Sequence, residues 1–83
     1  MKKIAYSKSS LKVPRRIPAN EAKRITSKIE QYASDPKSLA NNVKALVGSP
    51  YICLRVADWR VIMDDQANVI DVIKIGPRSD IYE

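Results

Sequence analysis

The first half of the chain carries one clear helical pattern. Apolar residues recur there at three- and four-residue spacing and would share one face of a helix: Ala22, Ile25, Ile29, Tyr32 and Ala33. Pro18 suits a first helical position. Asp35 precedes Pro36, and a residue before proline avoids the α region, so we expect the helix to end there.

Two shorter elements are predicted before this helix. Residues 2–7 have the alternation of a short strand. The serines within residues 7–10 offer N-caps for a short helix around Leu11 and Val13, which Pro14 limits or bends.

The second half of the chain is dominated by strand patterns. Residues 37–42 read as a polar loop, and residues 43–47 form a short apolar segment that ends at Gly48. Alternating or β-branched runs then predict strands at residues 51–56, 59–63 and 69–75. Ala57 and Asp58 leave only a tight connection between the first two of these strands.

The predicted order is therefore strand, helix, helix and an antiparallel run of three or four strands. This order is typical of an α+β fold in which the helices cover one face of the sheet. Eighty-three residues suffice for one small domain, and we expect residues 1–83 to form it. The other face of the sheet would then be open, and arginines from the strands could line it.

Charge adds a preference for an anionic partner. Fifteen Lys and Arg stand against nine Asp and Glu, which gives a net charge of +6. The charge is uneven, because residues 1–44 carry a net +8 and residues 45–83 a net −2. Such a field favours a polyanion, an acidic protein or both as partners.

Composition also removes several kinds of chemistry. The chain has no histidine, so it lacks the usual general base near neutral pH, and a single cysteine leaves no plausible zinc site. Two glycines cannot build a phosphate-cradling loop. We therefore expect no metal and no cofactor. A single cysteine, Cys53, excludes an internal disulfide, which suits the cytoplasm. We expect no membrane span because no apolar run is long enough.

Three arginines and one tyrosine are the candidate chemical groups. Arg55 and Arg60 lie in adjacent predicted strands, Arg78 follows a Gly-Pro break, and Tyr82 lies four residues further on. Guanidinium groups bind phosphate through paired hydrogen bonds, so these side chains would suit a phosphate-binding or phosphate-cleaving site. The alternative is ordinary surface pairing of each arginine with a nearby aspartate, and composition alone favours it.

Three motifs in register favour the phosphate site over ordinary surface pairing of these residues. Residues 54–62, Leu-Arg-Val-Ala-Asp-Trp-Arg-Val-Ile, resemble the Leu-Arg-Val-Gly-Asp-Tyr-Arg-Val-Ile signature of the RelE/ParE superfamily of bacterial toxins. Residues 76–82 are similar to the Gly-His-Arg-x-Asp-Val-Tyr ending of that family. Residues 44–48 are similar to its Lys-x-Leu-x-Gly lead-in. The resemblance covers essentially the whole chain.

The resemblance implies a RelE-like fold, a curved antiparallel sheet with two helices packed on one side. It also implies a metal-independent, ribosome-dependent mRNA endonuclease that uses the ribose hydroxyl of the RNA as nucleophile. Arg60, Arg78 and Tyr82 would then be catalytic, the arginines stabilising the scissile phosphate and Tyr82 acting as acid, base or orienting group. Lys44 and Lys74 would contact RNA.

Arg55 would be a further RNA contact, although it could be structural. The partners implied are a cognate acidic, RelB-like antitoxin in a hetero-oligomeric complex, and the ribosome with its mRNA. The chain departs from the family at Tyr51, Cys53 and Pro77, where many members carry cations or histidine. These departures keep two alternatives open: a ParE-like poison of DNA gyrase, and a catalytically weakened relative that binds an antitoxin.

Overall fold

The computed structural model describes residues 2–8, 10 and 17–77. Within them the elements follow in this order: β1 (Lys3–Tyr6), α2 (Ala19–Ser34), the 3₁₀ helix η2 (Pro36–Asn42), β2 (Val43–Ala45), β3 (Ile52–Val56), β4 (Trp59–Asp65) and β5 (Val69–Pro77). The short helix predicted around Leu11 and Val13 lies outside the described residues.

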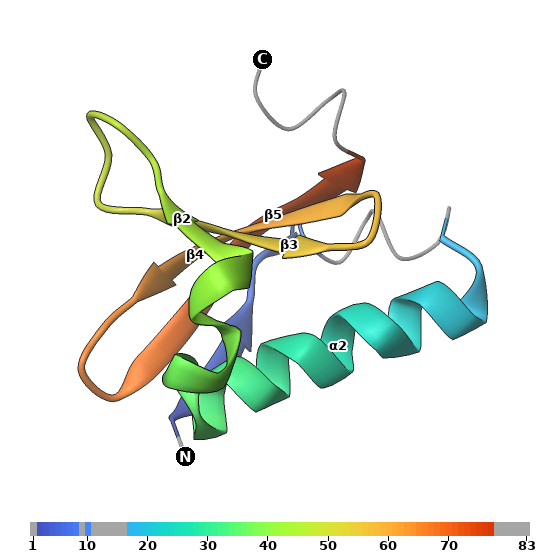
Figure 1. Cartoon of the computed structure of the whole chain (residues 1–83), viewed down its shortest axis with the longest axis horizontal. Helices are drawn as coiled ribbons and strands as arrows, with labels where there is room; N and C mark the ends of the chain where they lie inside the picture. Colours follow the sequence, from blue (N-terminus) through green and yellow to red (C-terminus); the bar gives the residue numbers. More distant parts are fainter. Residues whose placement is uncertain (1, 9, 11–16, 78–83) are drawn as a thin grey trace.

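The five strands form one sheet in the order β1-β5-β4-β3-β2 (Figure 1). Strands β2 to β5 pair antiparallel, as predicted, whereas β1 pairs parallel with β5. The sheet is therefore mixed, and the expectation of a wholly antiparallel sheet is corrected at this one edge. The connection permits this parallel pairing, because the chain passes through α2 and three further strands before β5 returns beside β1.

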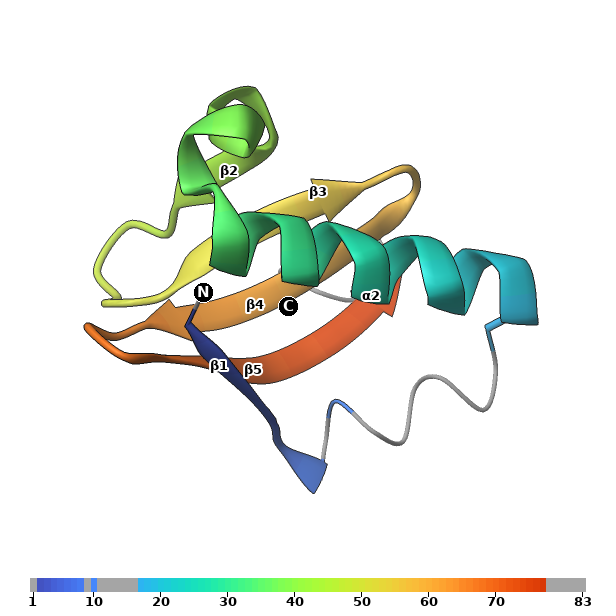
Figure 2. The same cartoon turned by 90° about the horizontal axis from the view of Figure 1, so that it is seen from below.

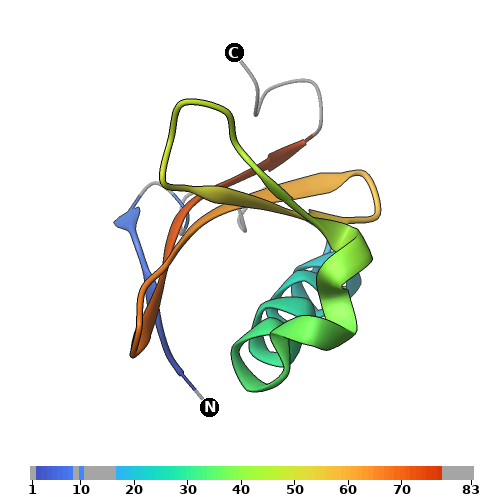
Figure 3. The same ribbon diagram turned by 60° about the vertical axis from the view of Figure 1, so that its left-hand side comes forward.

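Helix α2 covers one face of this sheet. It ends at Ser34 with Asp35 as its C-cap, as the sequence predicts, and it begins at Ala19, so Pro18 is the N-cap rather than the first helical residue. Its apolar stripe is buried, with Ile25 and Ile29 almost wholly excluded from solvent. Figure 2 shows α2 lying across the strands, and Figure 3 shows the sheet curving around it. The core between the two layers comes mainly from alternate strand residues: Leu54, Val56, Val61, Met63, Ile70, Val72 and Ile75.

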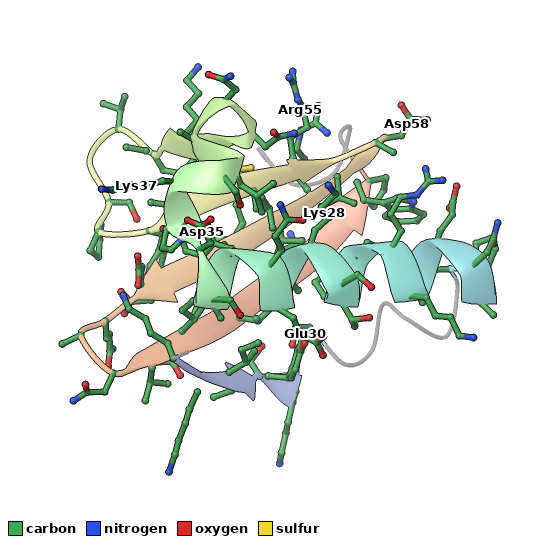
Figure 4. The ribbon with its side chains drawn as sticks, turned by 60° about the horizontal axis from the view of Figure 1, so that its bottom comes forward. Lys28, Glu30, Asp35, Lys37, Arg55 and Asp58 are labelled. Carbon is green, nitrogen blue, oxygen red and sulfur yellow. The ribbon has the colours of Figure 1, made fainter. Side chains whose placement is uncertain are left out.

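The segment after α2 differs from its prediction as a polar loop. Residues 36–42 form η2, in which Leu39 is buried against the core. A hydrogen bond from the Ser38 hydroxyl to the Asp35 carbonyl closes its first turn, and Figure 4 shows Asp35 and Lys37 at this junction. The single buried leucine explains the difference, because one apolar residue leaves no periodicity in the sequence yet anchors a helical turn.

The β3–β4 connection is as tight as predicted, and it is strained. Ala57 has a φ of 52°, in the left-handed region that favours glycine. A two-residue hairpin commonly needs a positive φ at its first central position. The turn fixes the register in which Arg55 lies directly opposite Arg60 and Val56 opposite Trp59.

Polar contacts close both ends of the sheet–helix sandwich. The Tyr32 hydroxyl donates a 2.8 Å hydrogen bond to an Asp65 carboxylate oxygen, and Lys2 pairs with the other oxygen. At the opposite end of α2, the Trp59 indole Nε1 donates a 2.8 Å bond to Glu21. These contacts hold α2 against β4 and thereby fix the strand that carries Arg60.

Candidate functional site

The face of the sheet turned away from α2, called here the outer face, carries the predicted cations. Strand residues alternate between the two faces, and the core residues of β3 and β4 point to α2. Their neighbours therefore point outward: Lys44, Cys53, Arg55, Arg60, Ile62 and Lys74. Figure 4 shows Arg55 projecting from β3 away from α2. The outer face thus brings together four of the six predicted site residues.

Part of the outer face is apolar. Cys53 and Ile62 are buried there, and Leu46, Tyr51 and Ile73 pack against them. The expectation of an open face is correct for Arg55, which is exposed, but not for Arg60 or for this patch, which are buried. The departures from the family pattern at Tyr51 and Cys53 have a structural counterpart, because these positions contribute apolar contacts where cations would stand.

Arg55 and Arg60 form a cross-strand pair of like charges. They are register partners in β3 and β4, which places their Cβ atoms about 5 Å apart. Like charges in this position destabilise a sheet unless an anion lies between them. Within the described residues, neither guanidinium makes an ion pair with a carboxylate. The pairings with Asp58, Asp64, Asp65 or Asp71 that would make these arginines ordinary surface residues are therefore not formed there.

Arg60 is held in place by the turn that precedes it. The residue is 8% exposed, and its Nη1 donates to the carbonyl oxygens of Ala57 at 3.0 Å and Trp59 at 2.9 Å. These two bonds use both Nη1 hydrogens. The Nε and Nη2 groups donate to nothing in the described part of the chain. A guanidinium presents Nε–H and one Nη2–H as a parallel pair, which is the geometry that binds a phosphate through two bonds.

A pocket of about 430 Å³ opens beside the two arginines. Its lining comes from the end of η2 and from β2, β3 and β4: Asn41, Asn42, Val43, Lys44, Cys53, Arg55 and Arg60. Its cations come from three different strands and are fixed by the sheet register. An anion in this pocket would meet one nearly buried guanidinium and two solvent-facing cations, a suitable arrangement for phosphate.

Two predicted site residues are not placed, and four residues that line the pocket were not predicted as site residues: Asn41, Asn42, Val43 and Cys53. Arg78 and Tyr82 lie outside the described residues. The described chain ends at Pro77, whose neighbour Gly76 is the register partner of Arg60. Lys74 lies on the outer face opposite Ile62 but does not line the pocket. Asn41 and Asn42 do line it. Their only signal in the sequence is adjacency to Lys44.

Residues 2–8, 10 and 17–77 contain neither a membrane-spanning helix nor a cluster of metal ligands. No helix there has the length and apolar character needed to span a membrane. No group of three or more His, Cys, Asp or Glu side chains lies close enough together to hold a metal ion in that part of the chain.

Comparison with solved structures identifies the fold. The chain is similar to RelE in a RelE–RelB complex from Pyrococcus horikoshii OT3, with 21% identity, a TM-score of 0.79, and coverage of 95% of this chain and 97% of that one. It is similar to YafQ from E. coli strain BL21(DE3), with 15% identity, a TM-score of 0.78 and full coverage of both chains.

A third similar structure is the RelB–RelE antitoxin–toxin complex from Methanococcus jannaschii, with 23% identity, a TM-score of 0.72 and 94% coverage of both chains. Comparisons with protein-family models and with curated proteins gave no match. The chain therefore has the α+β fold of the RelE and YafQ toxins, as the sequence motifs predicted, and its five-stranded sheet is mixed rather than wholly antiparallel.

Proposed function

We propose that this protein is the toxin of a type II toxin–antitoxin pair and that it cuts mRNA on the ribosome without a metal. The carrying observation is the Arg55–Arg60 pair, two opposed cations that meet no carboxylate in the described part of a RelE-like sheet. The similar structures include toxins crystallised with RelB and DinJ antitoxins. The resemblance of the sequence motifs implies that Arg60, Arg78 and Tyr82 occupy the positions that matter for cleavage.

The proposed reaction is a transfer within the RNA. The ribose 2′-hydroxyl loses its proton, its oxygen attacks the adjacent phosphorus, and the bond to the 5′ oxygen breaks as that oxygen takes up a proton. Negative charge grows on the phosphate oxygens in the transition state. Fixed donors stabilise such charge better than mobile ones. Arg60 suits this role because two carbonyl bonds already orient its guanidinium.

Arg78 and Tyr82 complete the proposed site. Arg78 would bind the same phosphate, and Tyr82 would move or orient a proton. An ordinary phenol has a pKa of about 10, so a base role near neutral pH requires a nearby cation. Arg78, four residues earlier in the chain, is the candidate for that cation.

The partner we propose is an acidic antitoxin. Residues 1–44 carry a net charge of +8, which would steer an acidic chain toward this protein. Steering of this kind acts on the association rate and is screened by salt. We expect the association rate with the antitoxin to fall as salt rises, and a salt-independent rate would argue against charge as the recruiting force.

The cellular test is expression of the unaltered chain and of variants that each lose one arginine. The unaltered chain should arrest growth and produce new mRNA ends inside translated codons. Arg60→Ala should lower the cleavage rate by about 10²–10³, the usual loss when one transition-state donor is removed. Arg55→Ala, at an exposed position, tests the same pocket with less risk to folding. Arg24→Ala removes an exposed arginine of α2 and should change nothing.

One observation favours a second candidate, a ParE-like poison of DNA gyrase. The apolar patch of Cys53, Ile62, Leu46, Tyr51 and Ile73 occupies part of the face where an RNA-cutting relative would carry cations. Apolar patches suit protein partners better than nucleic acid. Growth arrest with intact mRNA and gyrase-dependent DNA breaks would support this candidate. Stable antitoxin binding without any toxicity would indicate a weakened relative instead.

A further inference from the structure

The pocket beside Arg55 and Arg60 is chemically divided. Arg55 and Arg60 line its β3 and β4 side, whereas the adjacent residues Asn41 and Asn42 line its η2 side. Lys44 stands between them on β2, as the register partner of Cys53. A bare phosphate would need only the cationic side. The amides therefore require an explanation of their own.

The size of the pocket exceeds that of a phosphate. A volume of about 430 Å³ lies within the range of about 300–1,000 Å³ of small-molecule sites. This leaves room for a group attached to the phosphate. An asparagine amide offers a donor and an acceptor side by side, the arrangement that pairs with the edge of a nucleobase. Unstacked bases of single-stranded RNA expose such edges to proteins.

We propose that this pocket is a base-reading subsite for one nucleotide of single-stranded RNA. The phosphate lies against Arg55, Arg60 and Lys44, and the base edge lies against Asn41 and Asn42. The inference rests on the proposed function, because it names residues that select the RNA to be cut. It adds two positions to which none of the sequence motifs assigned a role.

The arrangement is favourable because both sides of the pocket are held by the fold. Arg60 is fixed by its bonds to the carbonyls of Ala57 and Trp59. Asn41 and Asn42 end η2, which the buried Leu39 anchors to the core. A nucleotide would thus meet two preformed surfaces, and little ordering free energy would be lost on binding.

The test is titration of the purified chain with each of the four nucleoside monophosphates and with inorganic phosphate, followed by calorimetry or NMR chemical shifts. We expect at least one nucleotide to bind about fivefold more tightly than the weakest, the low end of a base-edge contact. The Asn41→Ala/Asn42→Ala double variant should lose this discrimination and keep its affinity for inorganic phosphate. Arg55→Ala should weaken both ligands. Asn20→Ala, at an exposed asparagine of α2, is the matched control.

Three results would overturn the inference. Nucleotides could bind no better than inorganic phosphate, or the double alanine variant could keep full discrimination. A peptide rich in Asp and Glu could bind the pocket more tightly than every nucleotide, which would assign it to a protein ligand. These binding results do not depend on cleavage. If discrimination is found while cellular mRNA stays intact, the proposed function fails and the base-reading pocket stands. If mRNA is cut without discrimination, only this inference fails.

Discussion

Replacing Ala57 with glycine should stabilise the protein, because the turn between β3 and β4 is strained at this residue. An alanine in the left-handed region costs about 1–2 kcal/mol, and its φ here is 52°. Glycine removes that cost but loses about 0.5–1 kcal/mol more chain entropy on folding. The net gain should be about 0.5–1 kcal/mol. For a domain of this size, that raises Tm by about 2–8 °C.

The assay is thermal unfolding followed by circular dichroism, with urea unfolding as a second measure. The glycine variant keeps the carbonyl that accepts from Arg60 Nη1, so the site geometry should be unchanged. Asp58→Gly is the control, because Asp58 is not among the described residues with positive φ. It should be neutral or destabilising. A Tm for Ala57→Gly at or below that of the unaltered chain would refute the strain at Ala57. It would also argue against the strand register in which Arg55 lies opposite Arg60.

Three further predictions concern the contacts that hold α2 on the sheet. Trp59→Phe removes the indole bond to Glu21 and should lower the free energy of unfolding by about 1 kcal/mol; an unchanged urea midpoint would contradict it. Burial, followed by the hydrogen bond and charge of Asp65, raises the pKa of Tyr32 from 10.0 to about 12. The contribution of Tyr32 to the free energy of unfolding is therefore complete below pH 10 and is lost as pH rises toward about 12. Unfolding measured at stepped alkaline pH will check this, and Tyr32→Phe should lack the loss. Burial alone would raise the pKa of Asp65, but the hydrogen bonds from Lys2 and Tyr32 and the charge of Lys2 outweigh it and lower that pKa below 3.8. The stability that ionised Asp65 contributes is present above pH 3.8 and is lost as pH falls. The stability of Asp65→Asn should therefore depend less on acid pH than that of the unaltered chain. Equal acid sensitivity of the two would contradict this role of Asp65.

The long elements could be predicted from the sequence because their signals are local. The stripe around Ile25 and Ile29 fixed the face of α2, and the proline after Asp35 marked its end. The short connection at Ala57 predicted that β3 and β4 pair, which alone places Arg55 near Arg60. Each of these inferences depends on residues within a few positions of one another.

The features that the sequence did not reveal depend on contacts between distant segments. The parallel pairing of β1 with β5 joins residues more than sixty positions apart. A register shift between Ile62 and Met63 leaves Ile73 without a strand partner, and the Ser7 hydroxyl bonds the Ile73 carbonyl at 2.7 Å. No local pattern predicts that bond.

The candidate site also contains residues that local sequence signals could place and residues that they could not. The positions of Arg55 and Arg60 follow from strand alternation and one turn, so the sequence could place them. Asn41 and Asn42 reach the pocket only because η2 turns the chain into β2 at the edge of the sheet. A polar stretch without periodicity gave no reason to expect this. The missing carboxylate partners of the two arginines also became visible only in the fold, within the residues that it describes.

We propose above that a site including Arg60 cleaves mRNA on the ribosome. The most direct test adds the purified chain to a translating extract and maps the RNA ends, with a gyrase cleavage reaction run in parallel. We predict new ends within translated codons that disappear with Arg60→Ala and persist with Arg24→Ala, and no gyrase-dependent DNA breaks. Intact mRNA in the extract, with or without gyrase-dependent breaks, would contradict the account.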